Sequence, residues 1–178
     1  MDWSVALPNI WFLLITVLFT GFFVLEGYDF GVGVLAQLLG KDDIEKRVYF
    51  NTIGPFWDAN EVWLLTGGGA MFAAFPIWYG KLFSGYYIAF VLMLVALILR
   101  GVSFEFRGKL GDNRKWIKAC DFAMFIGSLL PPVLWGVAVA NFMTGANLDQ
   151  GKNLVDGFLG LLSPFTILGG IMMLLLML

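Results

Sequence analysis

Two acidic residues lie near the start of an otherwise apolar stretch of this sequence. Asp58 and Glu61 are three positions apart in residues 56–63, FWDANEVW, so in a helix they share one face. A carboxylate inside a membrane is costly unless it is paired, protonated or hydrated, which makes it a candidate proton carrier. Alternatively, both residues lie at headgroup level, or Asp58, three residues after Pro55, complements the dipole of a helix N-terminus.

A second pair of acids and one arginine occur in neighbouring apolar runs. Glu26 and Asp29 lie in the glycine-rich segment 26–33, EGYDFGVG, and Arg100 is the only arginine inside the apolar runs. A buried arginine requires a counter-charge, so we predict a structural salt bridge. Its candidate partners are Asp29, Asp58, Glu61 and Asp121. Asp121 is also explained as an acid at the start of a helix.

The composition indicates a membrane protein. Hydrophobic residues make up 60% of the 178 positions and charged residues 13%, which is typical of a polytopic, all-α transmembrane bundle. The net charge of −2 does not bear on nucleic-acid binding, but no basic patch interleaves with aromatics, so we expect no nucleic-acid partner. Histidine is absent, which removes the commonest metal and haem ligand, so we expect no metal site. Cys120 is the single cysteine, so no disulfide framework is expected.

Five apolar runs are long enough to be membrane spans, and we expect them to form one membrane domain over residues 1–178. The first has no signal-peptide features, so we expect it to be retained. The last is still apolar at Leu178, so we expect a fragment of a longer protein, with a four-helix bundle and the start of a fifth span. The predicted spans cover about residues 8–30, 55–79, 83–104, 119–144 and 161–178.

Basic residues in alternate loops predict the orientation. The loops after the first and third spans hold most of them, and the positive-inside rule places those loops in the cytoplasm. The other two loops hold only Lys81 and Lys152. The N-terminus then lies outside, and the acids and Arg100 lie toward the inner face. The residues that set this orientation are Lys41, Lys46, Arg47, Arg107, Lys109, Arg114, Lys115 and Lys118.

Small residues and prolines predict local features of two spans. The run Gly67-Gly68-Gly69-Ala70 in the second span favours close helix packing. Pro131-Pro132 in the fourth span predicts a kink.

Several motifs together resemble subunit II of the cytochrome bd-type quinol oxidases, in the N-terminal half of that subunit. The resemblance extends from about Ile10 to Phe165 and includes Arg100 and Asn141. Its motifs are GYDFGVG (27–33), PFWDANEVW (55–63), GGGAMFAAFP (67–76) and GSLLPP (127–132).

The resemblance implies a haem-free subunit of an enzyme that oxidises ubiquinol or menaquinol and reduces dioxygen to water. It implies a heterodimer with a subunit I that carries haems b and d, a prokaryotic cell membrane and a role in respiratory electron transport. A bound quinone and small accessory subunits are compatible with it. In the family, the aspartate that matches Asp58 is proposed to start a cytoplasmic proton path. We expect Asp58, Glu61 and Asp29 in that path, and Trp57, Arg100, Glu26 and Asp121 in a structural polar cluster.

Two other functions are compatible with intramembrane acids. One is a fragment of a proton-coupled secondary transporter, in which the acids couple proton flux to substrate movement. The other is a pure assembly subunit without a proton role.

Overall fold

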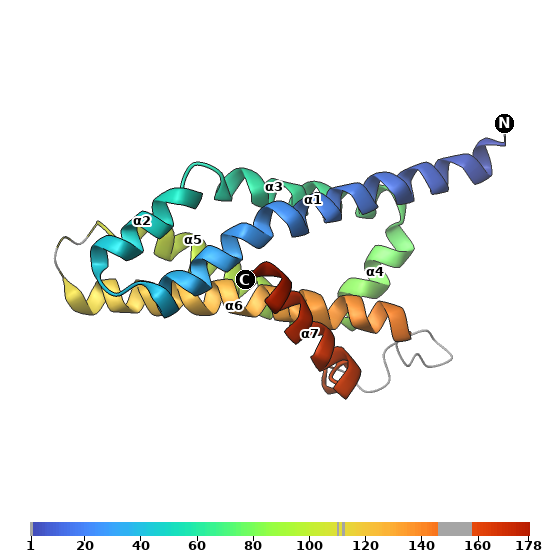
Figure 1. Ribbon diagram of the computed structural model, residues 1–178. Helices are drawn as coiled ribbons and strands as arrows, with labels where there is room; N and C mark the ends of the chain where they lie inside the picture. Colours follow the sequence, from blue (N-terminus) through green and yellow to red (C-terminus); the bar gives the residue numbers. More distant parts are fainter. Residues whose placement is uncertain (1, 110, 112, 146–157) are drawn as a thin grey trace.

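The structure is a computed structural model that describes residues 2–109, 111, 113–145 and 158–178. Four long helices lie along a common direction, with a short helix at each end and a last helix that crosses them (Figure 1). The described residues contain no strand, which confirms the all-α bundle. The elements are α1 (Trp3–Leu39), α2 (Asp43–Ile53), α3 (Trp57–Ala74), α4 (Pro76–Gly85), α5 (Tyr87–Phe106), α6 (Arg114–Thr144), the 3₁₀ turn η1 (Leu159–Leu161) and α7 (Pro164–Met177).

Polar side chains begin several of the helices. Asp2, Asp42 and Asn113 precede α1, α2 and α6, and each accepts a hydrogen bond from a backbone N–H of the first turn. Ser163 and Thr166 form a reciprocal capping box at the start of α7. Nearby, Asn141 of α6 donates to the carbonyl oxygen of Leu161 at 2.9 Å, which ties η1 to α6.

The second predicted span differs from the structure. The sequence predicted one helix over residues 55–79, whereas α3 ends at Ala74 and α4 begins at Pro76. Phe75 between them is non-helical, with φ −134° and ψ 60°. The reason is Pro76, which lacks an N–H and disfavours helical geometry in the preceding residue.

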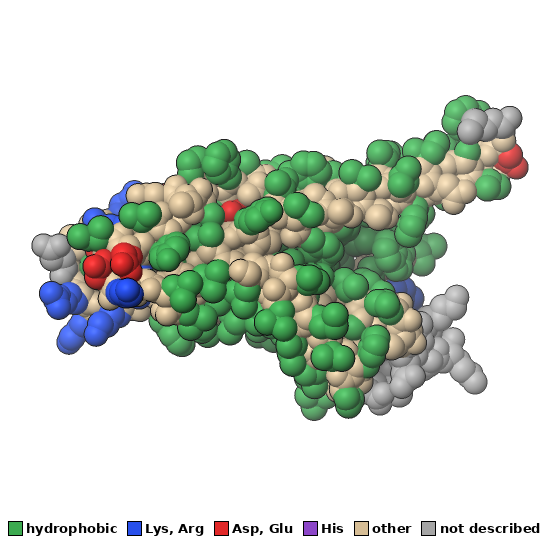
Figure 2. Space-filling model, viewed as in Figure 1, with side chains coloured by type: hydrophobic (Ala, Val, Ile, Leu, Met, Phe, Trp, Pro, Cys, Tyr) green, Lys and Arg blue, Asp and Glu red, His purple; other side chains and the backbone are tan. Residues whose placement is uncertain are grey.

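The outside of the bundle is largely apolar (Figure 2). Among the described residues, three helices are long and apolar enough to cross a membrane, namely α1, α5 and α6. On α5, Leu94, Val95 and Ile98 are each about half exposed. Such surfaces suit hydrocarbon tails, and the chain is a multi-pass membrane protein.

Glycines allow the helices to cross closely. A Cβ atom on Gly127 of α6 would lie 2.6 Å from the carbonyl oxygen of Ala96 and 2.7 Å from Cβ of Arg100. A Cβ atom on Gly136 of α6 would likewise meet the carbonyl oxygen of Gly169 and Cα of Gly170 on α7. In membranes, where helices associate through packing, small residues at these crossings are essential to the fold.

The triple-glycine run contributes to packing at one position only. A Cβ atom on Gly67 would lie 3.3 Å from the ring of Phe19, whereas Gly68 and Gly69 have no atom within 4 Å of that position. A kink was predicted at Pro131-Pro132. In the structure, α6 continues through these two prolines as one helix from Arg114 to Thr144.

We predict that Gly127→Val destabilises the bundle by about 1–3 kcal/mol or more, because the new side chain would meet backbone atoms of α5. The measurement is thermal unfolding of the purified protein in detergent. Gly68→Ala is the matched control, because its methyl group enters open space. Equal stability of the Gly127→Val variant and the control would contradict the prediction.

Candidate functional site

Arg100 is the centre of a buried ionic cluster between α1, α3 and α5. Its side chain is 1% exposed, and its guanidinium forms an ion pair with Glu26 of α1, which is 0% exposed. Asp29 Oδ2 lies 3.9 Å from Arg100 Nη2, and Glu61 Oε1 lies 3.5 Å from Arg100 Nη1. The guanidinium also lies over the ring of Phe30, 4.7 Å from its centroid. Three carboxyl groups therefore share one cation.

Helical spacing brings these residues together. Glu26, Asp29 and Phe30 are three and four positions apart on α1, so they face the same neighbour. From α3, Asn60 donates to Asp29 Oδ2 at 2.9 Å, and the adjacent Glu61 reaches Arg100. Because Asn60 uses its amide on Asp29, it links α3 to the cluster independently of charge.

Several polar atoms of the cluster have no hydrogen-bond partner in the described part of the chain. They are Glu26 Oε2 and Arg100 Nε and Nη2. Buried polar atoms are normally hydrogen-bonded, so these atoms have unused capacity for further hydrogen bonds.

Asp58 and Trp57 lie at the edge of this cluster. Asp58 is exposed, and within the described residues its carboxylate has no ion pair or hydrogen bond. Glu61, one helical turn further along α3, is partly exposed, with 24% of its side chain accessible. Trp57 is half-buried, and its ring lies 5.4 Å from that of Phe104 on α5. The acids thus range from exposed at Asp58, through partly exposed at Glu61, to buried at Asp29 and Glu26.

The predicted partners of Arg100 need correction. Asp29 and Glu61 are among its partners, but Glu26, which was not among the candidates, forms the buried pair. Asp58 and Asp121 form no ion pair with Arg100. Glu26 lies one turn before Asp29 and Phe30 on the same face of α1, but this spacing alone does not rank it above Asp29 as the partner of Arg100.

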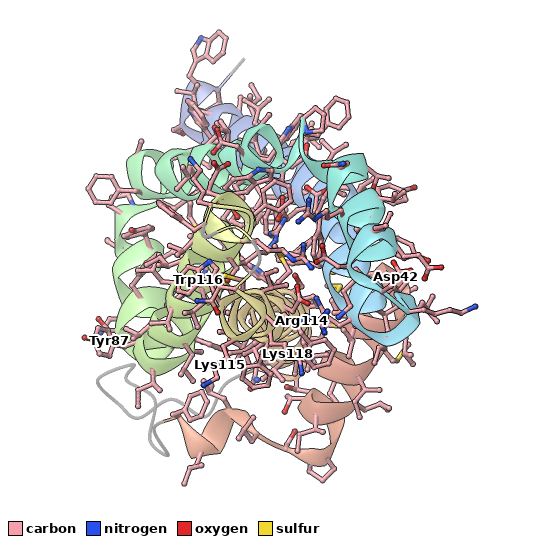
Figure 3. All side chains as sticks on the ribbon, turned by 90° about the vertical axis from the view of Figure 1, so that its left-hand side faces the viewer. Asp42, Tyr87, Arg114, Lys115, Trp116 and Lys118 are labelled. Atoms are coloured by element: carbon pink, nitrogen blue, oxygen red, sulfur yellow. The ribbon has the colours of Figure 1, made fainter. Side chains whose placement is uncertain are left out.

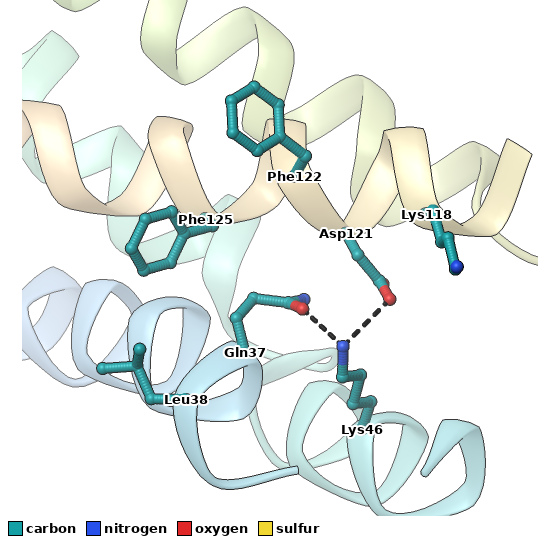
Figure 4. A pocket seen from close by; sticks show the side chains of 7 residues that line it. All are labelled: Gln37, Leu38, Lys46, Lys118, Asp121, Phe122 and Phe125. Atoms are coloured by element: carbon teal, nitrogen blue, oxygen red, sulfur yellow. Dashed lines mark hydrogen bonds and ion pairs between the residues drawn. The ribbon is translucent and has the colours of Figure 1, made fainter. Parts of the chain in front are cut away.

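Asp121 belongs to a second ionic cluster, at the end of the bundle where α2 lies. Arg107 Nε donates to Asp121 Oδ1 at 2.6 Å, and Arg107 Nη2 donates to Asp43 Oδ1 at 2.6 Å. Lys46 Nζ donates to Asp121 Oδ2 at 3.2 Å and to Gln37 Oε1 at 2.6 Å (Figure 4). These bonds tie the ends of α1, α2, α5 and α6 together.

Arg107 was assigned to a loop, but it directly follows α5 and is 6% exposed. Burial acts to lower the pKa of its guanidinium, but the hydrogen bonds and charges of Asp121 and Asp43 raise that pKa above its ordinary value. Burial likewise acts to raise the pKa of Asp43, but Arg107 and Arg47 lower it below its ordinary value. Both groups are therefore charged at neutral pH, and the second cluster is a structural ionic network.

The basic residues that predicted the orientation gather at this same end (Figure 2). Figure 3 looks onto it, with Arg114, Lys115 and Lys118 around the start of α6 and Asp42 at the start of α2. Lys81 lies in α4, at the opposite end of the bundle. Lys152 lies outside the described residues.

The residues of the first cluster do not fit haem ligation. The chain has no histidine, and the cluster offers carboxylates and a guanidinium instead of imidazole, thioether or thiolate groups. Within the described ranges, no three His, Cys, Asp or Glu side chains are placed to hold a metal ion. Carboxyl groups are the side chains of this cluster that can bind and release a proton.

The chain is similar to known proteins over most of its length. The sequence profile described as "Cytochrome bd terminal oxidase subunit II" matches residues 7–178. "Cytochrome bd ubiquinol oxidase subunit 2" of Bacillus subtilis (strain 168) is 53% identical over 166 residues, which cover 93% of this chain and 49% of the relative. "Cytochrome bd-I ubiquinol oxidase subunit 2" of Escherichia coli (strain K12) is 45% identical over 175 residues, covering 96% and 46%.

A third relative, "Probable cytochrome oxidase subunit 2" of Haemophilus influenzae, is 45% identical over 166 residues, covering 91% of this chain and 44% of the relative. The chain thus spans about half the length of the curated relatives it matches. Because the family profile matches nearly the whole sequence, the chain belongs to the family of cytochrome bd terminal oxidase subunit II.

Proposed function

We propose that this chain forms the first helical bundle of a haem-free subunit II, which supports quinol oxidation coupled to the reduction of dioxygen to water. The relatives from Bacillus subtilis and Escherichia coli are named as subunits of ubiquinol oxidases, which favours this activity. The partner is a subunit I that carries haems b and d, in a prokaryotic cell membrane. The missing histidines support the assignment of the haems to that partner.

Within this complex, Asp58, Glu61 and Asp29 carry protons from the cytoplasm toward the partner. The single observation that favours this path is the position of Glu61. It is partly exposed, it lies one turn from the exposed Asp58, and its carboxylate is 3.5 Å from the buried guanidinium of Arg100. One side chain therefore bridges the surface and the buried cluster.

The charges of the cluster support a proton-carrying role. One guanidinium lies near three carboxyl groups, so full ionisation would leave a net charge of −2 on mostly buried side chains. Carboxyl groups that share a buried site do not all ionise. We infer that the cluster holds at least one proton at neutral pH. A proton on Glu26 Oε2 would turn this unpaired acceptor into a donor.

The orientation completes the proposal. If the basic end of the bundle faces the cytoplasm, Asp58 takes protons from there and the N-terminus lies outside. Reduction of one dioxygen to water consumes four protons. When these come from the cytoplasm and quinol releases its protons outside, the reaction generates proton-motive force without a pump.

We expect Asp58→Asn to lower oxygen-reduction turnover by about tenfold while the haem spectrum stays unchanged, because a positioned proton carrier contributes about 10²–10⁴-fold and Glu61 still reaches the surface. The measurement is quinol-dependent oxygen consumption by the complex that contains the full-length subunit. Asp42→Asn is the matched control, since Asp42 is an exposed acid at the basic end and asparagine preserves the cap of α2. Wild-type turnover of Asp58→Asn would refute the proton role.

The transporter alternative makes a different prediction. It requires proton-driven uptake of a substrate into vesicles that lack a haem-bearing partner. The family relationship does not favour it, since the named relatives are oxidase subunits.

A further inference from the structure

An open groove of about 370 Å³ lies at the basic end of the bundle, between the last turn of α1, α2 and the first turns of α6. One side of it is polar and carries Lys46, Lys118 and Gln37 (Figure 4). The other side is apolar and carries Leu38, Phe122 and Phe125. The groove is therefore amphipathic, with one polar wall and one apolar wall.

The polar wall has hydrogen-bond donors that have no acceptor among the described residues. Lys46 Nζ has three donors, and Asp121 and Gln37 accept two of them. Gln37 Nε2 is buried, lines the same groove and has no partner in the described part of the chain. Lys118 is exposed on the opposite side of Asp121 from Lys46 (Figure 4). An acceptor oxygen in the groove would take the third donor of Lys46, and Lys118 adds a second positive charge beside it.

The electrostatics favour an anion, although Asp121 contributes to the groove. Arg107 donates two hydrogen bonds to Asp121, at 2.6 and 3.5 Å, so its charge is compensated from the protein side. Asp43 is likewise held by Arg107 and Arg47. With Lys46 and Lys118 added, four cations surround two carboxylates, which leaves the network with a net charge of +2.

The apolar wall distinguishes a lipid from a free anion. Phe122 is 67% exposed and Leu38 is 64% exposed, and both border the polar wall. Basic pockets between membrane helices at the cytoplasmic face are suited to anionic headgroups, with acyl chains along the neighbouring apolar side chains. We propose that this groove binds one anionic phospholipid. Its phosphate lies at Lys46 and Lys118, and its acyl chains lie along Phe122 and Phe125.

The test uses the intact oxidase complex with the full-length subunit, delipidated in detergent and then given phosphatidylglycerol or phosphatidylcholine. Native mass spectrometry counts retained lipid. We expect phosphatidylglycerol to be retained in preference to phosphatidylcholine. Lys118→Ala is expected to weaken this retention about fivefold, the effect of one basic side chain near an anionic lipid. Lys118 forms no ion pair with the described residues, so its removal leaves the second ionic cluster intact.

Lys115→Ala is the matched control, because Lys115 lies on the same turn of α6 but does not line the groove (Figure 3). An equal loss in both variants would reduce the effect to general surface charge and overturn the site. Phe125→Ala tests the apolar wall, and unchanged retention there would overturn the acyl contact. Inorganic phosphate that displaces the lipid at equal concentration would identify a free-phosphate site and overturn the lipid assignment. Loss of turnover in Asp58→Asn is a separate readout, so the proton path and the lipid site can fail independently.

Discussion

The substitution Arg100→Met is expected to prevent accumulation of the subunit. Among the described residues, it removes the only cation paired with Glu26 and Asp29, which are 0% and 2% exposed, and leaves their carboxyl groups buried. Breaking a buried ion pair by removing one partner costs about 3–5 kcal/mol, which is a large part of the stability of a typical domain. The measurement is the amount of subunit in membranes by immunoblot, together with the haem spectrum of the complex.

Charge compensation provides the decisive comparison. Combining Arg100→Met with Glu26→Gln and Asp29→Asn removes the uncompensated acids, so we expect the triple variant to recover much of the lost subunit. Arg47→Met is the control, because Arg47 pairs with Asp43 at 2.8 Å on the exposed surface of α2. If Arg100→Met accumulates as well as Arg47→Met, the cluster does not stabilise the bundle.

The double substitution Asp58→Asn with Glu61→Gln is expected to lower turnover by about 10²-fold or more. It removes the exposed carboxyl group and the partly exposed one between the surface and Arg100. Both replacements are close in size to the originals, and neither residue is the main partner of Arg100. The complex should therefore assemble with normal haem content, and the loss should appear in oxygen consumption.

This variant also separates a proton carrier from an assembly subunit. An assembly role requires that the double variant keep its turnover as long as the haem spectrum is normal. A proton role requires that turnover fall in the double variant further than in Asp58→Asn alone. A normal rate in an assembled double variant would remove the proton role from this chain.

The sequence predicted the composition of the first cluster better than its pairing. The sequence named four candidate partners of Arg100, of which Asp29 and Glu61 are correct, because charged groups in membrane helices have few possible partners. It also placed Glu26 in a predicted polar cluster with Arg100. It did not identify Glu26 as the main partner, since the choice among four nearby acids depends on helix rotation. That rotation is set by contacts such as Gly127 against α5.

The second cluster could not be predicted in the same way. Arg107 and Lys46 appeared as loop cations because they follow the apolar runs, and the positive-inside rule concerns only their number. Their burial arises because α2 folds back over the ends of α1 and α6, a tertiary arrangement with no local signal. Similarly, Pro76 alone explains the break between α3 and α4. The sequence predicted one continuous span there because the residues on both sides of Pro76 are apolar.

The exposure of Asp58 also distinguishes the sides of the bundle from one another. It lies at the start of α3 among Phe56 and Val62, which are 60% and 51% exposed. Acyl chains can solvate the flank of α5 around Leu94 and Ile98, but they cannot solvate an ionised carboxylate. An ionised Asp58 would therefore require water, headgroups or another polypeptide at the start of α3. The carboxylate of Asp58 thus marks a part of the bundle surface that lipid hydrocarbon does not cover.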